Sequence, residues 1–313
     1  MPEQPVIDMR RLHRFFGSTR AVNDISFEVM KGEVFGYIGP NGAGKTTSMR
    51  ILATLDIPTY GDALVDGFSV INDPDRVRRR LGFMPDYFGT YADVNCREYL
   101  DFFARAYGLR GNERRRALAH VMGFTKLDGL AEKPIRGLSK GMKQRLCLGR
   151  SMIHDPSVLI LDEPAAGLDP RARIELRQMI RELADNGKTI LVSSHILTEL
   201  AEMCDRVGII ERGELLAVGT VAEIQRGQIT HCQIKARVLE NVAAVATWLE
   251  NRGDVESIRV DGQLIRFSHV GESDAQAALL REMILAEFAI AEFGIEQRSL
   301  EDVFMHVTRG VVQ

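Results

Sequence analysis

The residues with the clearest chemical meaning in this chain are the eight from Gly39 to Thr46. They read Gly39-Pro40-Asn41-Gly42-Ala43-Gly44-Lys45-Thr46, which matches the pattern G-x-x-x-x-G-K-[ST] of a loop that binds phosphates. The loop follows an apolar run at 34–38 that predicts a strand, and it precedes residues 46–52, which have a helical pattern. Its glycines let backbone N–H groups turn inward, and the helix N-terminus adds a positive dipole. We therefore expect Lys45 to contact the β- and γ-phosphates of a nucleotide and Thr46 to ligate Mg²⁺, with Thr47 completing the phosphate-binding set.

A second pair of candidate residues, Asp162 and Glu163, follows the apolar run 157–161. Such a run predicts a strand buried on both faces of a parallel sheet. Acidic side chains at the carboxyl end of such a strand face the ligand crevice of an open α/β sheet. We expect Asp162 to hold the hydration shell of Mg²⁺, and Glu163 to polarise the water molecule that attacks the γ-phosphate.

A third pattern precedes a helical segment and reads Leu138-Ser139-Lys140-Gly141-Met142-Lys143-Gln144-Arg145. It resembles the signature motif of ABC-type ATPases, usually written LSGGQ, with Lys140 in place of Gly and Met142 in place of Gln. Ser139 is suited to cap the helix, and Gly141 permits a close approach of the backbone. The resemblance implies that Ser139 and Gly141 contact the γ-phosphate of ATP held by a second subunit, so that two chains enclose two nucleotides.

Three further segments resemble the same family. Gly167-Leu168-Asp169 resembles the loop that lines the dimer interface, with Asp169 as its acid. A β-branched run from residue 189 ends at His195, whose position implies a hydrogen bond to the γ-phosphate. Phe16 is similar in position to the aromatic residue that stacks on adenine, which is more often Tyr. The adjacent Phe15 is the alternative stacking residue.

One departure from the family pattern lies at Asp86, which follows Pro85 where the family normally has Gln. In the family this residue reaches Mg²⁺ and the attacking water. A third acid beside Asp162 and Glu163 should raise the pKa of a neighbouring carboxyl. We expect Asp86 to sense Mg²⁺ through a water molecule; the alternative is that it only caps its loop.

The composition fits a nucleotide-binding protein without a nucleic-acid partner. The 313 residues carry a formal net charge of −3 and a pI of about 6.2, which give no general attraction to nucleic acid. The four cysteines lack metal-binding spacing, as expected in a reducing compartment. No apolar stretch approaches the ~18 residues needed to span a bilayer, so we expect any membrane channel to be another polypeptide.

The resemblance extends from about Val6 to Ile224 and implies an α/β fold, the P-loop NTPase core of ABC-type ATPases, with antiparallel β and helical subdomains. We predict an ATP-binding domain over 1–227, with a helical subdomain at about 87–155 that contains helices at 95–107, 112–122 and 140–153. The second domain, 228–313, is predicted to be a small accessory α+β domain.

The predicted elements of the second domain follow the order β-α-β-β-α-β of a ferredoxin-like sandwich. They are a strand at 232–238, a helix at 241–251, strands at 257–260 and 263–267 around the turn Asp261-Gly262, a helix at 273–288 and a strand at 289–297. A last helix is predicted at 299–307. The segment Ser299-Leu300-Glu301-Asp302-Val303-Phe304 resembles the tail of ABC-2-type exporter ATPases.

These resemblances imply an ATP-hydrolysing subunit of an ABC-2-type exporter that dimerises around two MgATP, as a homodimer or with a similar subunit. It would drive a separate integral-membrane permease from the cytoplasmic face of the membrane. The main alternative is an ABC-type ATPase that acts on ribosomes or DNA, although no second phosphate loop and no long coiled coil are visible. A monomeric kinase or GTPase is disfavoured by the signature and by His195. The transported substrate is not encoded in these patterns.

Overall fold

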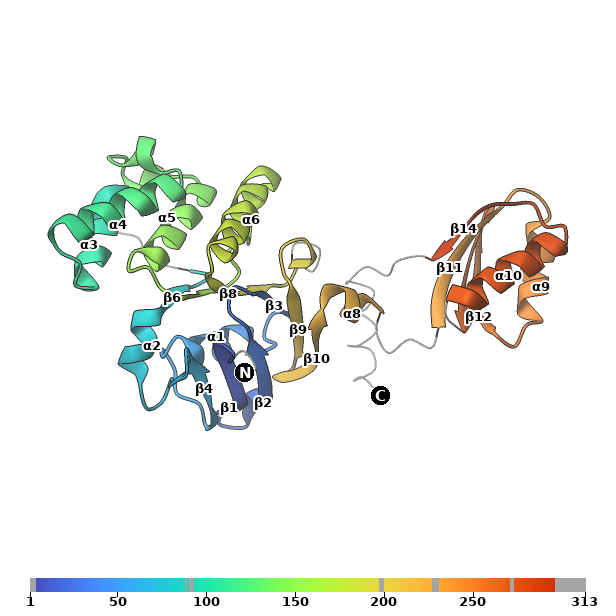
Figure 1. Cartoon of the computed structure of the whole chain (residues 1–313), viewed down its shortest axis with the longest axis horizontal. Helices are drawn as coiled ribbons and strands as arrows, with labels where there is room; N and C mark the ends of the chain where they lie inside the picture. The colour runs from blue at the N-terminus through green and yellow to red at the C-terminus, as the bar shows by residue number, and fades with distance from the viewer. Residues whose placement is uncertain are drawn as a thin grey trace. The chain divides into compact units, whose positions relative to one another are not determined.

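The computed structural model of the chain describes residues 4–87, 89, 93–196, 200–226, 231–270 and 273–295 (Figure 1). Contacts between residues divide the chain into two units, with a boundary in the sequence between Val221 and Ala222. The predicted domain boundary between residues 227 and 228 stays a prediction. Among the described residues, no helix combines the length and the apolar character needed to cross a membrane.

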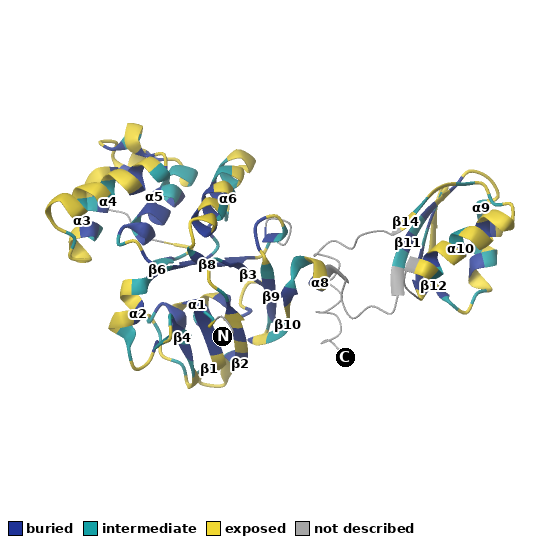
Figure 2. Ribbon diagram, viewed as in Figure 1, coloured by how far each residue is buried: buried dark blue, intermediate teal, exposed yellow. Residues whose placement is uncertain are grey.

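A six-stranded sheet forms the centre of the first unit. Its spatial order is β10 (Glu214–Thr220), β9 (Arg206–Glu211), β3 (Val34–Ile38), β8 (Thr189–Ser194), β7 (Val158–Leu161) and β6 (Leu81–Met84). The neighbours from β9 to β6 pair in parallel, whereas β10 pairs with β9 in antiparallel. Residues of β3, β7 and β8 are all buried, as expected for strands covered on both faces (Figure 2).

A smaller sheet packs against the first across helix α1 (Lys45–Leu52). Its order is β2 (Thr19–Val29), β1 (Ile7–Phe16), β4 (Tyr60–Val65) and β5 (Phe68–Ser69), and every pair is antiparallel. Phe27 of β2 stacks on Phe35 of β3 with ring centroids 4.8 Å apart, so the core lies between the two sheets. Helix α2 (Pro74–Arg80) leads from β5 to β6.

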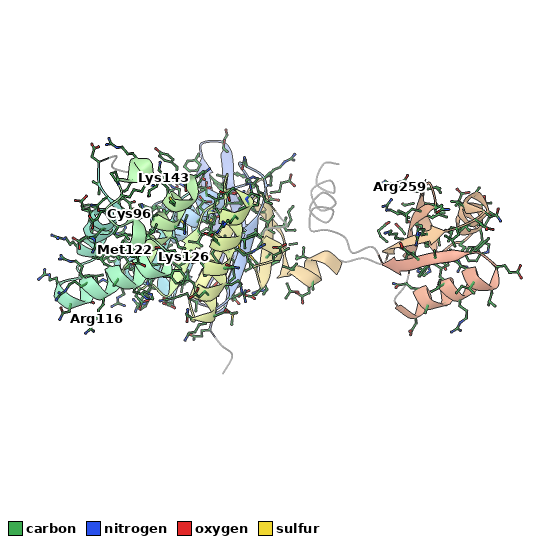
Figure 3. All side chains as sticks on the ribbon, turned by 90° about the horizontal axis from the view of Figure 1, so that it is seen from above. Cys96, Arg116, Met122, Lys126, Lys143 and Arg259 are labelled. Carbon is green, nitrogen blue, oxygen red and sulfur yellow. The ribbon has the colours of Figure 1, made fainter. Side chains whose placement is uncertain are left out.

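The three helices predicted for the helical subdomain are observed as α3 (Cys96–Ala106), α4 (Gly111–Phe124) and α5 (Lys140–Met152), with short 3₁₀ turns at Asp128–Leu130 and Ile135–Gly137. The structure shows why α3 begins at Cys96. Asn95 accepts a hydrogen bond from the backbone N–H of Glu98, whose carboxylate accepts one from the Asn95 N–H. Cys96 and Met122 are buried in this subdomain, while Arg116 and Lys126 lie on its surface (Figure 3).

Helix α6 (Pro170–Asp185) covers the face of the six-stranded sheet opposite α1 (Figure 1). Asp169 begins this helix by accepting a hydrogen bond from the N–H of Ala172, and Pro170 occupies the first turn, where a missing N–H is harmless. The sheet thus has a helix on each face, which is the layer arrangement predicted for the core. Helix α8 (Val221–Arg226) follows β10.

The second unit has the predicted ferredoxin-like order: β11 (His231–Val238), α9 (Val242–Glu250), β12 (Val255–Asp261), β13 (Leu264–Val270), α10 (Ser273–Leu285) and β14 (Ile290–Ile295). Its antiparallel sheet has the order β12-β13-β11-β14. Alternate residues of β11 and β13, including Ile234 and Phe267, form a separate core with Val245, Leu249, Leu279 and Met283 of the two helices.

The turn of the β12–β13 hairpin corrects the predicted one by a single residue. Asp261 still pairs with Leu264, so the turn residues are Gly262 and Gln263 rather than Asp261 and Gly262. Gly262 has φ 58°, and this placement puts the positive φ at the first turn position, where a two-residue hairpin requires it. The predicted last helix at 299–307 lies outside the described residues.

Candidate nucleotide-binding site

The candidate residues converge on one edge of the six-stranded sheet. Gly39 follows β3, Asp86 follows β6, Asp162 follows β7 and His195 follows β8. These four strands run parallel, and β8 lies between β3 and β7, so their carboxyl ends meet. This is the edge at which open α/β sheets bind ligands.

Lys45 is the buried cation of the phosphate loop, and its side chain is 5% exposed. Its Nζ donates hydrogen bonds to the carbonyl oxygens of Gly39 at 2.6 Å and Pro40 at 3.2 Å. The same ammonium lies 3.4 Å from Oε1 of Glu163. The loop therefore presents a cation that is held in place by its own backbone and by the acid after β7.

At two positions of the loop only glycine fits, because a Cβ would clash with the backbone of a neighbouring segment. A Cβ on Gly39 would lie 2.3 Å from the carbonyl oxygen of Ile210, and a Cβ on Gly44, at φ 104°, would lie 2.3 Å from that of Ala21. Gly42, at φ 81°, has open space where its Cβ would be and is needed only for its backbone conformation. Within the described residues, no side chain caps α1, so its first N–H groups are available for an anion.

Asp162 is buried at 1% exposure. Its Oδ1 accepts a hydrogen bond of 2.7 Å from Oγ of Ser193, and the Thr46 hydroxyl lies near the carboxylate. Its buried Oδ2 has no hydrogen-bond partner among the residues that the structure describes. Burial raises the pKa of Asp162, and the hydrogen bonds oppose this increase.

Glu163 is the residue on which the site converges. Its Oε2 lies 2.8 Å from Nδ1 of His195, and its Oε1 lies 3.4 Å from Nζ of Lys45. The carboxylate is 13% exposed, whereas the imidazole is 46% exposed. The backbone of Glu163 has φ 48°, a left-handed conformation that is unfavourable for a side chain other than glycine. Glu163 and His195, which the sequence singled out separately, are thus in direct contact.

Asp86 lies exposed after β6, and its negative charge contributes to the raised pKa of Asp162. The direction agrees with the expectation for a third acid. However, burial is the largest cause of the increase, and the charges of Glu163 and Asp86 are smaller ones.

The two candidate stacking residues have different surroundings. Phe16 is 50% exposed, with the Arg14 guanidinium 4.4 Å from its ring centroid. Phe15 is partly buried, and its ring makes edge contacts with His13 and Tyr60 at centroid distances of 5.7 and 6.2 Å. Phe16 therefore has the more accessible ring.

The signature residues contact α6 of the same chain. Ser139 caps α5, as predicted, by accepting a hydrogen bond of 3.3 Å from the Met142 N–H. A Cβ on Gly141 would lie 3.1 Å from Cβ of Ala172, which is the close approach expected of this glycine. The Lys140 ammonium lies against Gly167, where a Cβ would come within 2.4 Å of Nζ. Lys140 and Gly141 thus join the signature to the segment around Asp169.

Ser193 is a residue of the site that the sequence patterns did not single out. It is fully buried on β8 and contacts both acids, through the Asp162 carboxylate and the backbone N–H of Glu163. The one signal available was a serine near the end of a largely apolar strand, two residues before His195.

The site has the chemical groups that a magnesium–nucleotide complex needs. A lysine ammonium and an uncapped helix N-terminus fit phosphate groups. The unpaired Asp162 Oδ2, with the hydroxyl of Thr46 beside it, fits a cation that prefers few protein ligands and several water or phosphate oxygens. The fold and the site together define a P-loop nucleotide-binding protein.

Comparisons with known proteins give the family. The family model described as ABC transporter matches residues 22–166. The chain is 33% identical over 308 residues to the Nod factor export ATP-binding protein I of Ralstonia nicotianae, covering 97% of this chain and 94% of that protein. It is 32% identical over 219 residues to the linearmycin resistance ATP-binding protein LnrL of Bacillus subtilis, covering 70% of each. The chain therefore belongs to the ATP-binding proteins of the ABC transporter family, whose members are ATPases.

A solved structure agrees with this assignment. The ATP-binding subunit of an ABC transporter is 31% identical, with a TM-score of 0.64, and the match covers 71% of this chain and 92% of that chain.

Proposed function

We propose that this chain is the ATP-hydrolysing subunit of an ABC-2-type exporter, in which two ATP-binding subunits enclose two MgATP and drive a separate permease. In this proposal residues 1–227 form the ATP-binding domain, and residues 228–313 form an accessory domain that steadies the dimer or regulates the partner. The observation that carries the proposal is the contact of Glu163 with both Lys45 and His195.

The catalytic step follows from these contacts. Glu163 accepts a proton from a water molecule as its oxygen attacks the γ-phosphorus, and the bond from that phosphorus to the bridging oxygen of ADP breaks. Lys45 stabilises the negative charge on the phosphates, and His195 donates a hydrogen bond to the γ-phosphate. Phe16 stacks on adenine. The backbone of residues 39–47, including Pro40, Asn41 and Ala43, surrounds the phosphates.

A bound Mg²⁺ would neutralise charge on the phosphate oxygens. Thr46 and Asp162 are the residues that would hold it, with Asp86 acting through water. Because Asp162 is buried and partly satisfied by Thr46 and Ser193, its carboxylate is preorganised for this purpose.

The dimer is proposed because the signature residues provide a second helix N-terminus that is suited to a phosphate group. Ser139 and Gly141 lie at the start of α5, and a Cβ on Gly141 would lie 3.1 Å from Ala172 of α6, the helix that Asp169 caps. In the proposed dimer these residues complete the site of the other subunit.

The names of the related proteins support a membrane permease as the partner of this chain. One is named for Nod factor export and another for linearmycin resistance. CbiO1 of Clostridium perfringens is described as part of a complex with other Cbi proteins, and a further cassette is described as dimeric. In the proposed assembly this chain lies peripherally on the cytoplasmic face of the membrane, bound to its permease, and the permease selects the cargo.

A Glu163→Gln variant tests the enzymatic part. It keeps the size of the side chain but removes the base, so steady-state ATP hydrolysis should fall by about 10²–10⁴-fold while ATP binding persists. With ATP and Mg²⁺ the variant should form a long-lived dimer in size-exclusion chromatography with light scattering. Glu182→Gln, an exposed residue of α6, is the matched control. Wild-type hydrolysis in the Glu163 variant, or its failure to dimerise with any nucleotide, would contradict this assignment.

The partner is tested by gentle solubilisation of native membranes with the tagged chain. Co-purification of a polytopic membrane protein that increases ATP hydrolysis supports the transporter assignment. Recovery of ribosomes or DNA-bound factors instead would favour an ABC-type ATPase of the translation or DNA-repair classes.

A further inference from the structure

Ser193 makes two hydrogen bonds that join the acids of the site. Its hydroxyl donates to Oδ1 of Asp162 at 2.7 Å, and its oxygen accepts from the backbone N–H of Glu163 at 2.9 Å. Because the single hydroxyl proton is directed at Asp162, the oxygen lone pairs are left to face the Glu163 N–H. The residue is fully buried, so water does not compete for either bond.

The second hydrogen bond acts on an unusual piece of backbone. Glu163 has φ 48°, a conformation that persists in a non-glycine residue only when its surroundings enforce it. The carbonyl oxygen of Glu163 accepts a hydrogen bond of 3.1 Å from the Ala166 N–H, so the peptide groups on both sides are held. Of these restraints, the Ser193 hydroxyl is the one supplied by a side chain from another strand.

This backbone conformation determines where the Glu163 carboxylate lies. The side chain must reach Nζ of Lys45 with one oxygen and Nδ1 of His195 with the other. Rotation about φ toward the ordinary negative range would redirect the Cβ and carry the carboxylate away from both groups. A hydrogen bond on the backbone N–H therefore controls the position of the atoms that do the chemistry.

We propose that Ser193 is a positioning residue for ATP hydrolysis: it holds the backbone of Glu163 in the left-handed conformation that directs the catalytic carboxylate at the γ-phosphate. The inference rests on the proposed function of Glu163 as the base. Ser193 itself does not touch the nucleotide, and it acts through Glu163 and the adjoining Asp162.

Thr189 provides a matched control on the same strand. Its Oγ1 accepts a hydrogen bond of 3.0 Å from the Gly32 N–H, and the residue is 1% exposed. Thr189→Val thus removes a buried hydroxyl from β8 at the end of the strand far from the site. Both Thr189→Val and Ser193→Ala should lower the melting temperature, so stability alone does not distinguish them.

Hydrolysis distinguishes them. We expect Ser193→Ala to lower kcat by about 10–100-fold, the loss typical of residues that orient a catalytic group, with KM for ATP and the Kd for fluorescent ATP almost unchanged. Ser193→Thr, which keeps the hydroxyl, should recover most of kcat, and Thr189→Val should retain the wild-type kcat. A wild-type kcat in Ser193→Ala, or an equal loss of kcat in the control, would overturn the proposal.

Two further measurements separate positioning from a general structural effect. In single-turnover reactions Ser193→Ala should cause almost no further loss of the hydrolysis rate when Glu163 is already Gln, because the two residues act as a unit. An additive loss of rate would contradict this.

Hydrogen exchange at the Glu163 amide should speed up in Ser193→Ala and not in Thr189→Val. If wild-type protein hydrolyses no ATP, the proposed function fails, while the exchange result still decides whether Ser193 holds this backbone.

Discussion

The Nδ1 atom of His195 lies 2.8 Å from Oε2 of Glu163, and the other oxygen of that carboxylate faces Lys45. The three side chains come from the ends of β8 and β7 and from the start of α1. One carboxylate thus links the phosphate loop to the histidine after β8. A change in any of the three groups alters the environment of the other two.

His195→Ala should reduce ATP hydrolysis by about 10²-fold or more, because it removes a hydrogen-bond donor from the γ-phosphate and a partner from Glu163. ATP binding should change little, since the phosphate loop is intact. Initial rates and the Kd of a fluorescent nucleotide check this. His120→Ala, an exposed residue on α4, is the control. Hydrolysis at the wild-type rate would remove His195 from the site.

Phe16→Ala should weaken ATP binding by about 1–3 kcal/mol, the usual value of one base–aromatic contact, and Phe16→Tyr should restore it. Phe15→Ala should mainly lower stability, because Phe15 packs against His13 and Tyr60. Fluorescence titration with ATP and thermal unfolding distinguish the two effects. The opposite pattern would make Phe15 the stacking residue.

Asp86→Gln should alter the response to Mg²⁺. It removes a negative charge that acts on Asp162, so the Mg²⁺ concentration for half-maximal hydrolysis should rise by about two- to fivefold, the range of a screened charge near a surface. Hydrolysis measured against Mg²⁺ at saturating ATP checks this, with Asp155→Asn as an exposed control. Unchanged Mg²⁺ dependence and rate would leave Asp86 as a loop cap.

His154 should make the stability of the first unit depend on pH. Its Nε2 contacts the Leu81 carbonyl oxygen at 3.2 Å, and its ring stacks on Tyr107 at 3.7 Å. Burial lowers the pKa of His154 from 6.5 to about 4. Between these values the unfolded chain binds a proton that the folded chain does not, so the free energy of unfolding should fall as the pH decreases, by up to about 3 kcal/mol.

The corresponding experiment is urea unfolding between pH 7 and pH 4. In His154→Gln, which stays neutral, this part of the pH dependence should disappear. His120→Gln should retain the wild-type profile. An identical profile in wild type and His154→Gln would show that the buried imidazole does not contribute.

Much of the fold was predictable, because the sequence patterns that mark its strands, helices and turns each lie within one short segment. The strand before Gly39, the helices at 95–107, 112–122 and 140–153, and the order of elements in the second unit follow from apolar periodicity and turn residues, and all are observed. The hairpin turn at Gly262 differs by one residue, since Asp-Gly marks a turn without fixing the register of the strands beside it.

The sequence by itself determined the residue types of the site. The phosphate loop has its whole chemistry within one short segment, so the order of its residues specifies a binding loop wherever the fold places it. The acids after β7 and the histidine after β8 were likewise recognisable. Ser193 was not, because a serine in a buried strand has no local pattern that distinguishes a structural hydroxyl from one that contacts a catalytic residue.

Only the tertiary structure decided which of these residues meet. Residues 163 and 193 are distant in sequence, and they become neighbours because β8 is placed between β3 and β7. Strand order depends on crossover connections and long-range packing rather than on the pattern of any one strand. The same packing holds Glu163 at φ 48° and buries Asp162 with one oxygen unpaired among the described residues. Both are properties of the assembled sheet edge.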